Sequence, residues 1–402
     1  MVNPFYSHRG WGYRVAQAAR VRVQRLWARR ARSRGLVCVV PIVDTEGPGT
    51  GSPTDLSSWE AVDAQVAQVM EEGFRGLLLD SAGQSVKLSW FLEDASGCRD
   101  PQKRATAPFE VLDHYRQVWG TQLGERGDGL FWHYHHYPPS GEFRPDPDWS
   151  THRRYDDLLT RLILERQFCP GAIRTGWTSS SNVFGQWLDT VVPFDFSSRA
   201  PYWFPGVADW SRAPTSWRPY QPSASDYQRP GTLSHSIFRA LDADNPRWCT
   251  RWELEKAFVA AAAGQVTCLA FFSHDYKDMA AHFAGVLQEI ARIARRYPGV
   301  AWRHATATEA ARLAVGAPEL PPLELRVEKG QQITAFANNP LFGGSPWLAV
   351  RSATGEYHRF PGEPAGSAPD LSWHWSLPKD AQAAAISAVD VTGQSQVVTV
   401  PL

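Results

Sequence analysis

The sequence predicts an α/β protein in which a barrel of alternating strands and helices is followed by a small β-sandwich. Two observations predict the barrel. Short apolar runs alternate with helix-compatible segments up to Ala317, and the runs are apolar almost throughout, as strands buried on both faces are. A third observation predicts the sandwich, because short β-prone pieces separated by turn residues begin after Ala317. We therefore expect a barrel over residues 36–318 and a β-sandwich over 319–402.

The length and charge of the chain limit the classes of function. At 402 residues it has room for two or three domains of ~100–200 residues each. Its 41 basic and 41 acidic residues cancel, which argues against a nucleic acid or another polyanion as the partner of the whole protein. No stretch approaches the ~18 consecutive apolar residues of a membrane span. The 18 tryptophans predict either a well-filled interior or flat faces for stacking on sugars.

Residues 1–35 form a basic arm with nine arginines and no acidic residue. Arginines interrupt each apolar stretch of the arm, so it lacks the apolar region of a secretory signal and is expected to be a basic helix. Such a helix either packs on the main domain or contacts a membrane surface or another polyanion.

The five cysteines are scattered and form no C-x-x-C pair, which indicates neither a disulfide framework nor a cysteine zinc site. A reducing compartment follows from this usage. We expect a cytoplasmic protein, and the basic arm adds the hypothesis of peripheral contact with the inner face of the membrane.

The expected elements of the barrel follow one another in order. The expected strands are LVCVVPIV (36–43), FRGLLLD (74–80), VKLSWFLED (86–94), GLFWH (129–133), GAIRTGW (171–177), VVPFDF (191–196) and VTCLAFF (266–272). The helix-compatible segments are 59–72, 107–123, 154–167, 182–189, 249–262 and 279–297. The sandwich is expected to use LELRVEKG, QQITAFANN, PWLAVRS, GEYHRF, LSWHWSL, AAAISAVD and QVVTV.

The segment 201–234 is too long, and too rich in proline, serine and tryptophan, to be an ordinary connection between two elements. Long connections of this kind tend to carry function. Trp203, Trp210 and Trp217 are therefore candidates for a wall that stacks on sugar rings. Trp132 and Trp177, near the ends of expected strands, are further candidates for substrate binding.

The first strand ends in a pair of carboxylates. VVPIVDTEG places Asp44 and Glu46 two residues apart, so that both side chains point to the same face of the strand. A β/α barrel keeps its active site at the C-terminal ends of its strands, which is where this pair lies. The pair is suited to acid–base or metal chemistry.

Three histidines follow another strand in GLFWHYHHYPP: His133, His135 and His136. His133 and His135 share a face if the strand continues, whereas His133 and His136 share one if the chain becomes helical. Two imidazoles and a carboxylate are an ordinary ligand set for a divalent metal ion with positions left open for water and substrate. The sequence therefore predicts a metal site, with His135 and His136 as rival ligands.

Three further strand ends carry polar side chains. Arg174 in AIRTGW would hold a neighbouring carboxylate such as Asp44 ionised. Asp195 lies in PFDFSS, and His274 in FFSHDYKDM is a candidate proton donor whose tautomer an aspartate would fix.

The order of these motifs resembles the polysaccharide deacetylase (NodB-homology) family of carbohydrate esterases. The resemblance covers residues 36–315, where VKLSWFLED is similar to the family's second strand and GVAWRHATATEAARLA to its closing strand and helix. It implies a distorted (β/α) barrel. It also implies one divalent metal ion, usually zinc, that activates water for hydrolysis of an N-acetyl group.

The resemblance also implies roles for the site residues. Asp44 would be the general base and Glu46 the metal carboxylate, in a D-x-E variant of the family's acidic pair. His133 would be a metal ligand together with His135 or His136, in place of the family's histidines four residues apart. The geometry of a continuing strand favours His135.

The remaining roles concern proton transfer. By the same resemblance Arg174 orients Asp44, although its motif lacks the family's usual proline. Asp195 tunes His274, and His274 protonates the leaving amine, because an amide anion is too poor a leaving group to depart unprotonated.

The sequence therefore predicts a metal-dependent deacetylase that acts on an N-acetylated sugar in the assembly of a bacterial surface glycan, such as lipopolysaccharide O-antigen or capsule. Two alternatives stand beside it: a catalytically silent glycan-binding protein on the same barrel, and a hydrolase of another C–N amide bond. A bound metal ion together with release of acetate distinguishes the first hypothesis from the others.

Overall fold

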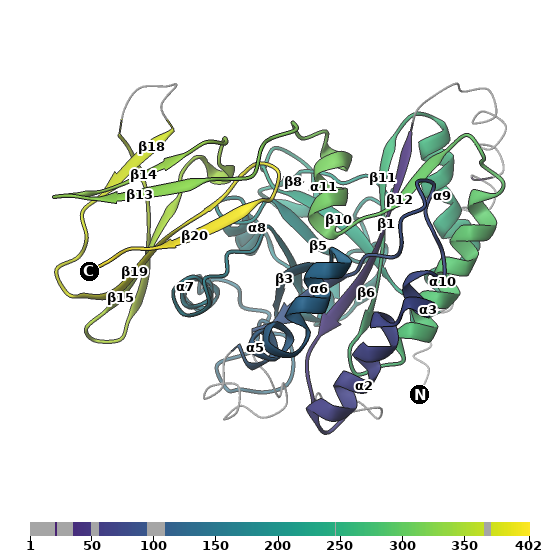
Figure 1. The fold of residues 1–402 in the computed structure, drawn as a ribbon, viewed down its shortest axis with the longest axis horizontal. Coiled ribbons are helices and arrows are strands. Elements are labelled where there is room, and N and C mark those ends of the chain that lie inside the picture. Colours follow the sequence, from purple (N-terminus) through teal and green to yellow (C-terminus); the bar gives the residue numbers. More distant parts are fainter. Residues whose placement is uncertain (1–20, 22–34, 50–55, 95–108, 246, 366–370) are drawn as a thin grey trace.

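The computed structural model describes residues 21, 35–49, 56–94, 109–245, 247–365 and 371–402 (Figure 1). The predictions for the basic arm fall, apart from Val21 and Gly35, outside the described residues. Within the described part of the chain, no helix is both long enough and apolar enough to cross a membrane.

Seven parallel strands form a closed barrel. In order around the barrel they are β1 (Leu36–Thr45), β2 (Ser89–Glu93), β3 (Gly129–Tyr134), β4 (Ala172–Thr175), β5 (Phe194–Ser198), β10 (Ser236–Asp242) and β11 (Val266–His274). The barrel closes because β11 pairs with β1 from Leu36↔Val266 to Asp44↔His274. A further strand, β12 (Ala301–His304), pairs with the first four residues of β1. It lies on the same side of β1 as β2, which pairs with the last four residues of that strand.

Helices surround the barrel (Figure 1). They are α2 (Trp59–Met70), α3 (Glu72–Arg75), α5 (Glu110–His114), the π-helical turn η1 (Tyr115–Trp119), α6 (Gly120–Arg126), α7 (Arg153–Arg166), α8 (Asn182–Leu188), α9 (Arg251–Ala262), α10 (Met279–Ala294) and α11 (Ala307–Val315). Several of these helices start with a polar N-cap residue. Thr306, for example, forms a capping box with Glu309 at the start of α11.

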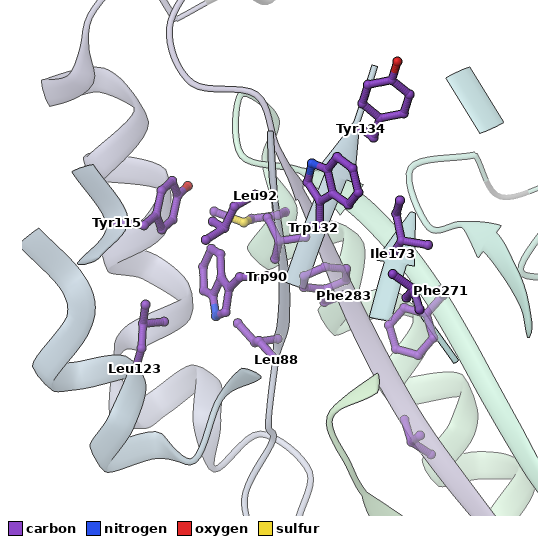
Figure 2. Packing of buried hydrophobic residues seen from close by; sticks show 14 of the residues in the cluster. Leu88, Trp90, Leu92, Tyr115, Leu123, Trp132, Tyr134, Ile173, Phe271 and Phe283 are labelled. Carbon is purple, nitrogen blue, oxygen red and sulfur yellow. The ribbon is translucent and has the colours of Figure 1, made fainter. Parts of the chain in front are cut away.

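Alternate residues of the barrel strands enter two different cores. Side chains that point inward form a cluster to which all seven strands contribute, including Cys38, Val40 and Ile42 of β1. Side chains that point outward pack against the helices in a larger cluster. Figure 2 shows part of this outer layer, where Trp90 and Leu92 lie opposite Tyr115. Burial on both faces explains why the strands read as nearly continuous apolar runs.

The predicted strand positions hold for six of the seven strands and fail at two places. The run 74–80 is not a strand: it holds the end of α3 and a turn in which Leu77 and Leu79 are 41% and 53% exposed. The seventh barrel strand is instead β10, which the sequence reading placed in no strand. Apolar runs alone therefore predicted a strand at 74–80 that is absent, and they did not indicate β10, which begins after a long loop.

The segment 201–234 contains the short strand pairs β6 (Trp203–Phe204) with β7 (Ala208–Asp209), and β8 (Pro222–Ser223) with β9 (Asp226–Pro230). Trp210 is fully buried in a small core with Ile237, and its ring nitrogen donates to the Thr178 carbonyl at 2.7 Å. Trp217 is also buried and donates to the Glu253 carbonyl at 2.9 Å. The predicted wall of three sugar-stacking tryptophans is therefore wrong for Trp210 and Trp217, whereas Trp203 is 47% exposed.

The C-terminal part consists of two four-stranded antiparallel sheets, as the β-prone pieces predicted. One sheet contains β13 (Leu325–Lys329), β14 (Ile333–Ala337), β18 (Ser372–Trp375) and β17 (Glu363–Pro364), and the other β16 (Tyr357–Pro361), β15 (Trp347–Ser352), β19 (Ala381–Val389) and β20 (Ser395–Thr399). Buried residues of both sheets, such as Ile333 and Ile386, belong to one hydrophobic cluster. The second sheet packs on α7, where Arg359 pairs with Asp156 and stacks 4.3 Å from the Trp347 ring.

Candidate metal centre

The C-terminal ends of the barrel strands bring polar side chains into one pocket of about 250 Å³. The alternation of β1 explains the first two: after the inward-pointing Val40 and Ile42, the next positions of the same parity are Asp44 and Glu46. His133 and His135 continue the parity of the inward-pointing Phe131 in the same way. The pocket is lined by Asp44, Glu46, His133, His135, Phe143, Arg174, Thr175, Trp177, Thr178, Arg199, Asp242, Phe272, His274 and Tyr276.

Glu46, His133 and His135 form a buried group that could hold a metal ion. The His135 Nε2 and His133 Nε2 atoms lie 3.6 and 3.8 Å from Glu46 Oε1 and 2.9 Å from each other. One ligand atom from each residue therefore lies within 4.8 Å of the other two. Two imidazole nitrogens and one carboxylate oxygen suit a divalent ion such as zinc.

A hydrogen bond outside this group orients His133. Its Nδ1 atom lies 2.9 Å from the backbone carbonyl oxygen of Arg174, and this carbonyl can only accept. Nδ1 therefore carries a proton, and the ring presents Nε2 to Glu46 and His135. Metal-binding histidines are commonly oriented by such a bond to a carbonyl group, so the residues present fit a metal ion.

The charges within the group are coupled. Burial disfavours the charge of Glu46, but the neighbouring His133 and His135 imidazoles outweigh it and hold the pKa of Glu46 well below its usual value. Burial also disfavours charge on His133, yet Asp44 and Glu46 raise its pKa, whereas burial lowers the pKa of His135. The 2.9 Å contact between the His133 and His135 Nε2 atoms requires one proton between the two imidazoles, because one nitrogen must donate to the other. A divalent cation would replace that proton, because metal ligands bind deprotonated.

Asp44 is paired with Arg174, as predicted. The Arg174 Nε atom lies 2.9 and 2.8 Å from the two carboxylate oxygens of Asp44, and both residues are almost fully buried. Burial would raise the pKa of Asp44, but the Arg174 guanidinium, with His133 and His274, lowers it below its usual value. Arg174 is itself held by a bond of 2.8 Å from Nη1 to the Phe196 carbonyl. Asp44 is therefore an ionised carboxylate in a fixed orientation.

His274 lies at the same pocket, with Nε2 3.7 Å from Glu46 Oε1. It is not part of the group whose donor atoms all lie within 4.8 Å. Burial lowers the pKa of His274 to about 4, against the opposing effect of Glu46 and Asp44. Its Nδ1 atom has no hydrogen-bond partner among the described residues. Burial therefore favours the neutral form of this imidazole beside the candidate metal group.

The predicted partnership of Asp195 with His274 is not present. Asp195 lies between the inward-pointing Phe194 and Phe196, so its side chain points out of the barrel. Its carboxylate accepts hydrogen bonds from the backbone and side chain of Ser197. The Ser197 hydroxyl oxygen accepts from the Thr175 amide at 2.9 Å, so Asp195 braces the end of β4.

His136 also points away from the pocket, which removes it as the rival ligand. Its Nδ1 atom lies 2.7 Å from the Tyr134 hydroxyl, and its Nε2 atom 2.8 Å from the Asp148 carbonyl. The ring stacks on Trp149 at 4.0 Å between centroids. Because both nitrogens are engaged, His136 packs in the outer layer.

The aromatic candidates at strand ends divide in the same way. Trp132 is 1% exposed and packs outward against Tyr134 and Trp187, so its predicted contact with substrate is wrong. Trp177 does line the pocket, with its ring 4.5 Å from the His135 ring and 5.5 Å from that of Phe143.

The sequence reading missed several residues of the pocket. Arg199 follows β5 and forms an ion pair with Asp242 at the end of β10. Burial, together with Asp244, raises the pKa of Asp242 to about 7. A usable signal exists for Asp242, which follows Phe238 and Ala240 at alternate positions as Asp44 follows Val40 and Ile42. Tyr276 and Phe143 lie in loops that offer no comparable pattern.

Comparison with known proteins adds no assignment. No protein-family model matches the chain, and no curated protein matches it. A solved structure with some similarity is that of a putative alpha-L-fucosidase from Bacteroides thetaiotaomicron, with 9% sequence identity over 92% of this chain and 95% of that one. The TM-score is 0.29, a likeness too weak to support a conclusion about fold or function.

Proposed function

We propose that the protein is a metal-dependent hydrolase that removes an N-acetyl group from a sugar, on a barrel of the polysaccharide deacetylase type. The observation that carries the proposal is the joint presence, in one pocket, of the Glu46–His133–His135 group, the Asp44–Arg174 pair and His274. These are a candidate metal group, an ionised carboxylate and a titratable imidazole, which are the parts that hydrolysis of an amide requires.

The cofactor is one divalent metal ion, most readily zinc, held by Glu46, His133 and His135. When bound, such an ion supplies a Lewis acid that makes water nucleophilic at neutral pH and polarises the acyl oxygen. The buried carboxylate compensates the charge of the cation, and the Arg174 carbonyl keeps the His133 ring in position.

Asp44 and His274 would handle the protons. Asp44 is held ionised by Arg174 and can accept a proton from the attacking water. His274 can deliver a proton to the nitrogen as the carbon–nitrogen bond breaks, giving a free amine and acetate. Burial favours the neutral form of His274, so the proton that it delivers is one that the reaction has released. Asp44 and His274 are register partners on β1 and β11 and therefore border the same side of the pocket.

A carbohydrate substrate is favoured by the rest of the pocket. Trp177, Phe143 and Tyr276 supply ring faces for a sugar, and the Arg199–Asp242 pair supplies polar groups for hydroxyls. The order of the sequence motifs resembles the deacetylase family and suggests a role in the assembly of a bacterial surface glycan, such as O-antigen or capsule.

The test combines metal analysis with acetate release from a panel of N-acetylated sugars, oligosaccharides and surface glycans. We expect about one divalent ion per chain and acetate release that Glu46→Gln abolishes. His136→Gln is the matched control, because it changes a neighbouring histidine that points away from the pocket. Binding of a glycan without acetate release from any substrate would favour the silent glycan-binding protein. Release of a different acid would favour hydrolysis of another amide.

A further inference from the structure

Asp275 is a fully buried carboxylate at the candidate metal centre that the proposed chemistry does not use. It follows His274 directly at the end of β11. Its Oδ1 atom accepts a hydrogen bond from the Glu46 amide at 3.1 Å, and its Oδ2 atom accepts one from the Gly47 amide at 3.1 Å. The Tyr115 hydroxyl donates a third bond of 3.1 Å to Oδ2.

These bonds fix a turn that the barrel sheet does not hold. The strand β1 ends at Thr45, so the backbone of Glu46 and Gly47 lies beyond the last strand residue. Gly47 has a φ of 68°, a left-handed conformation that glycine adopts without the steric cost that other residues meet. A Cβ atom at Gly47 would lie 3.0 Å from the Trp59 ring, so the turn is also closely packed.

Asp275 connects this turn to two rigid parts of the molecule. Its own amide donates to the Asp44 carbonyl at 3.2 Å, which joins the ends of β1 and β11. Through Tyr115 its carboxylate is tied to the outer core, where the Tyr115 ring packs 5.4 Å from that of Trp90. The orientation of the Glu46 backbone, and hence of its side chain, depends on these contacts.

We infer that Asp275 is a positioning residue that aims the Glu46 carboxylate at His133 and His135, so that metal affinity depends on a residue outside the ligand group. Asp275 does not belong to the described group of candidate ligands, and its carboxylate oxygens accept from the turn and from Tyr115. This inference rests on the proposed function, because it assigns Glu46 to a metal ion.

The test is the affinity of the metal-free full-length protein for zinc, measured by calorimetric titration. In Asp275→Asn an amide NH₂ group faces a backbone N–H donor, so at least one bond to the turn is lost. Removal of a supporting contact behind a metal ligand typically weakens binding 10–100-fold, and we expect a loss of about that size. Excess zinc should restore part of the hydrolytic rate, because the ligands and the proton-transfer groups are unchanged.

A second pair of variants separates positioning from general stability. Tyr115→Phe removes only the third bond to Asp275 and should weaken zinc binding by a smaller factor. Tyr297→Phe is its matched control, because the Tyr297 hydroxyl, just after α10, donates to the buried Glu255 carboxylate of α9 at 2.8 Å. It should lower the melting temperature without changing zinc affinity.

The outcomes distinguish the inference from the proposed function. If the wild type takes up no zinc, both the metal assignment of the proposed function and this inference are overturned. If the wild type binds zinc and Asp275→Asn binds it equally well, only the inference fails. Should Asp275→Asn not fold, Tyr115→Phe decides, because an affinity equal to that of wild type refutes the positioning role.

Discussion

The inward and outward side chains of the same barrel strands differ sharply in what they do. On β3 and just beyond it, His133 and His135 enter the pocket, whereas Trp132, Tyr134 and His136 pack between the barrel and its helices. The two sets alternate residue by residue, and both are almost completely buried. The comparison teaches that burial and residue type do not identify a site residue in this protein. A site residue is identified by its place in the alternation along the strand, which decides whether its side chain faces the barrel interior.

The same comparison holds between strands. On β1, Asp44 faces inward and forms an ion pair with Arg174, whereas on β5 Asp195 faces outward and accepts a hydrogen bond from Ser197. Both are buried aspartates near strand ends. Their environments differ because apolar residues of inward parity flank Asp195 on both sides. Substitutions on the two faces should therefore have separable effects.

The largest expected effect is loss of the metal ion on the inward face. His133→Ala should abolish stoichiometric zinc and with it acetate release, because one of two imidazole ligands is gone. His136→Ala should retain the zinc and cost about 1–3 kcal/mol of stability through two lost hydrogen bonds. Elemental analysis and thermal unfolding measure both. Zinc lost from His136→Ala but retained in His133→Ala would reverse the assignment of faces.

The next effect concerns catalysis without loss of the ion. Asp44→Asn and His274→Ala should keep the zinc yet lower the rate of acetate release ~10²–10⁴-fold, because each removes a proton-transfer group. Asp195→Asn is the outward control and should change the rate far less. If Asp44→Asn loses the zinc while Glu46→Gln retains it, the two carboxylates have exchanged roles.

A tryptophan from each face gives the third contrast. Trp132→Ala should lower the free energy of unfolding by about 3–5 kcal/mol, because it leaves a cavity in the outer core. Trp177→Ala should change stability less and raise KM, because its ring borders the pocket. Denaturant unfolding and steady-state kinetics measure the pair. An unchanged KM in Trp177→Ala would exclude that ring from substrate contact.

The last contrast is a change in pH dependence, which is small over any one pH unit. Burial, together with Asp244, raises the pKa of Asp242 to about 7, so the folded protein holds a proton there that the unfolded chain releases near pH 4. This contribution to stability is present below pH 4 and is lost as the pH rises to 7, by at most about 1.4 kcal/mol per pH unit. Asp242→Asn should flatten this decline in urea titrations at several pH values. A slope equal to that of wild type would mean that Asp242 is ionised in the fold.

The sequence predicted much of the fold because the barrel strands are buried on both faces and their apolar runs stand out. It failed at 74–80, where Arg75 makes a buried ion pair with Asp128 and both Leu77 and Leu79 are exposed. Only tertiary contacts distinguish such a run from a strand. It missed β10 because buried polar residues, Ser236, Arg239 and Asp242, interrupt the apolar run of that strand.

For the candidate site, the two-residue spacing of Asp44 with Glu46 and of His133 with His135 was sufficient, because strand geometry converts that spacing into a shared face. The same rule, applied to Phe194 and Phe196, would have turned Asp195 outward. Asp275 could not be found in this way, because its role consists of hydrogen bonds to backbone amides that leave no mark in the sequence.

The closure of the barrel by β1 and β11 also determines when the site comes into existence during folding. The paired residues, from Leu36↔Val266 to Asp44↔His274, lie 230 positions apart in the chain, so their contact closes a very long loop. Pairing over such a distance is expected to be slow and to come late. The last pair of this ladder is Asp44 with His274. Recovery of hydrolytic activity after dilution from denaturant would therefore time ring closure, and helix formation should precede it by a wide interval.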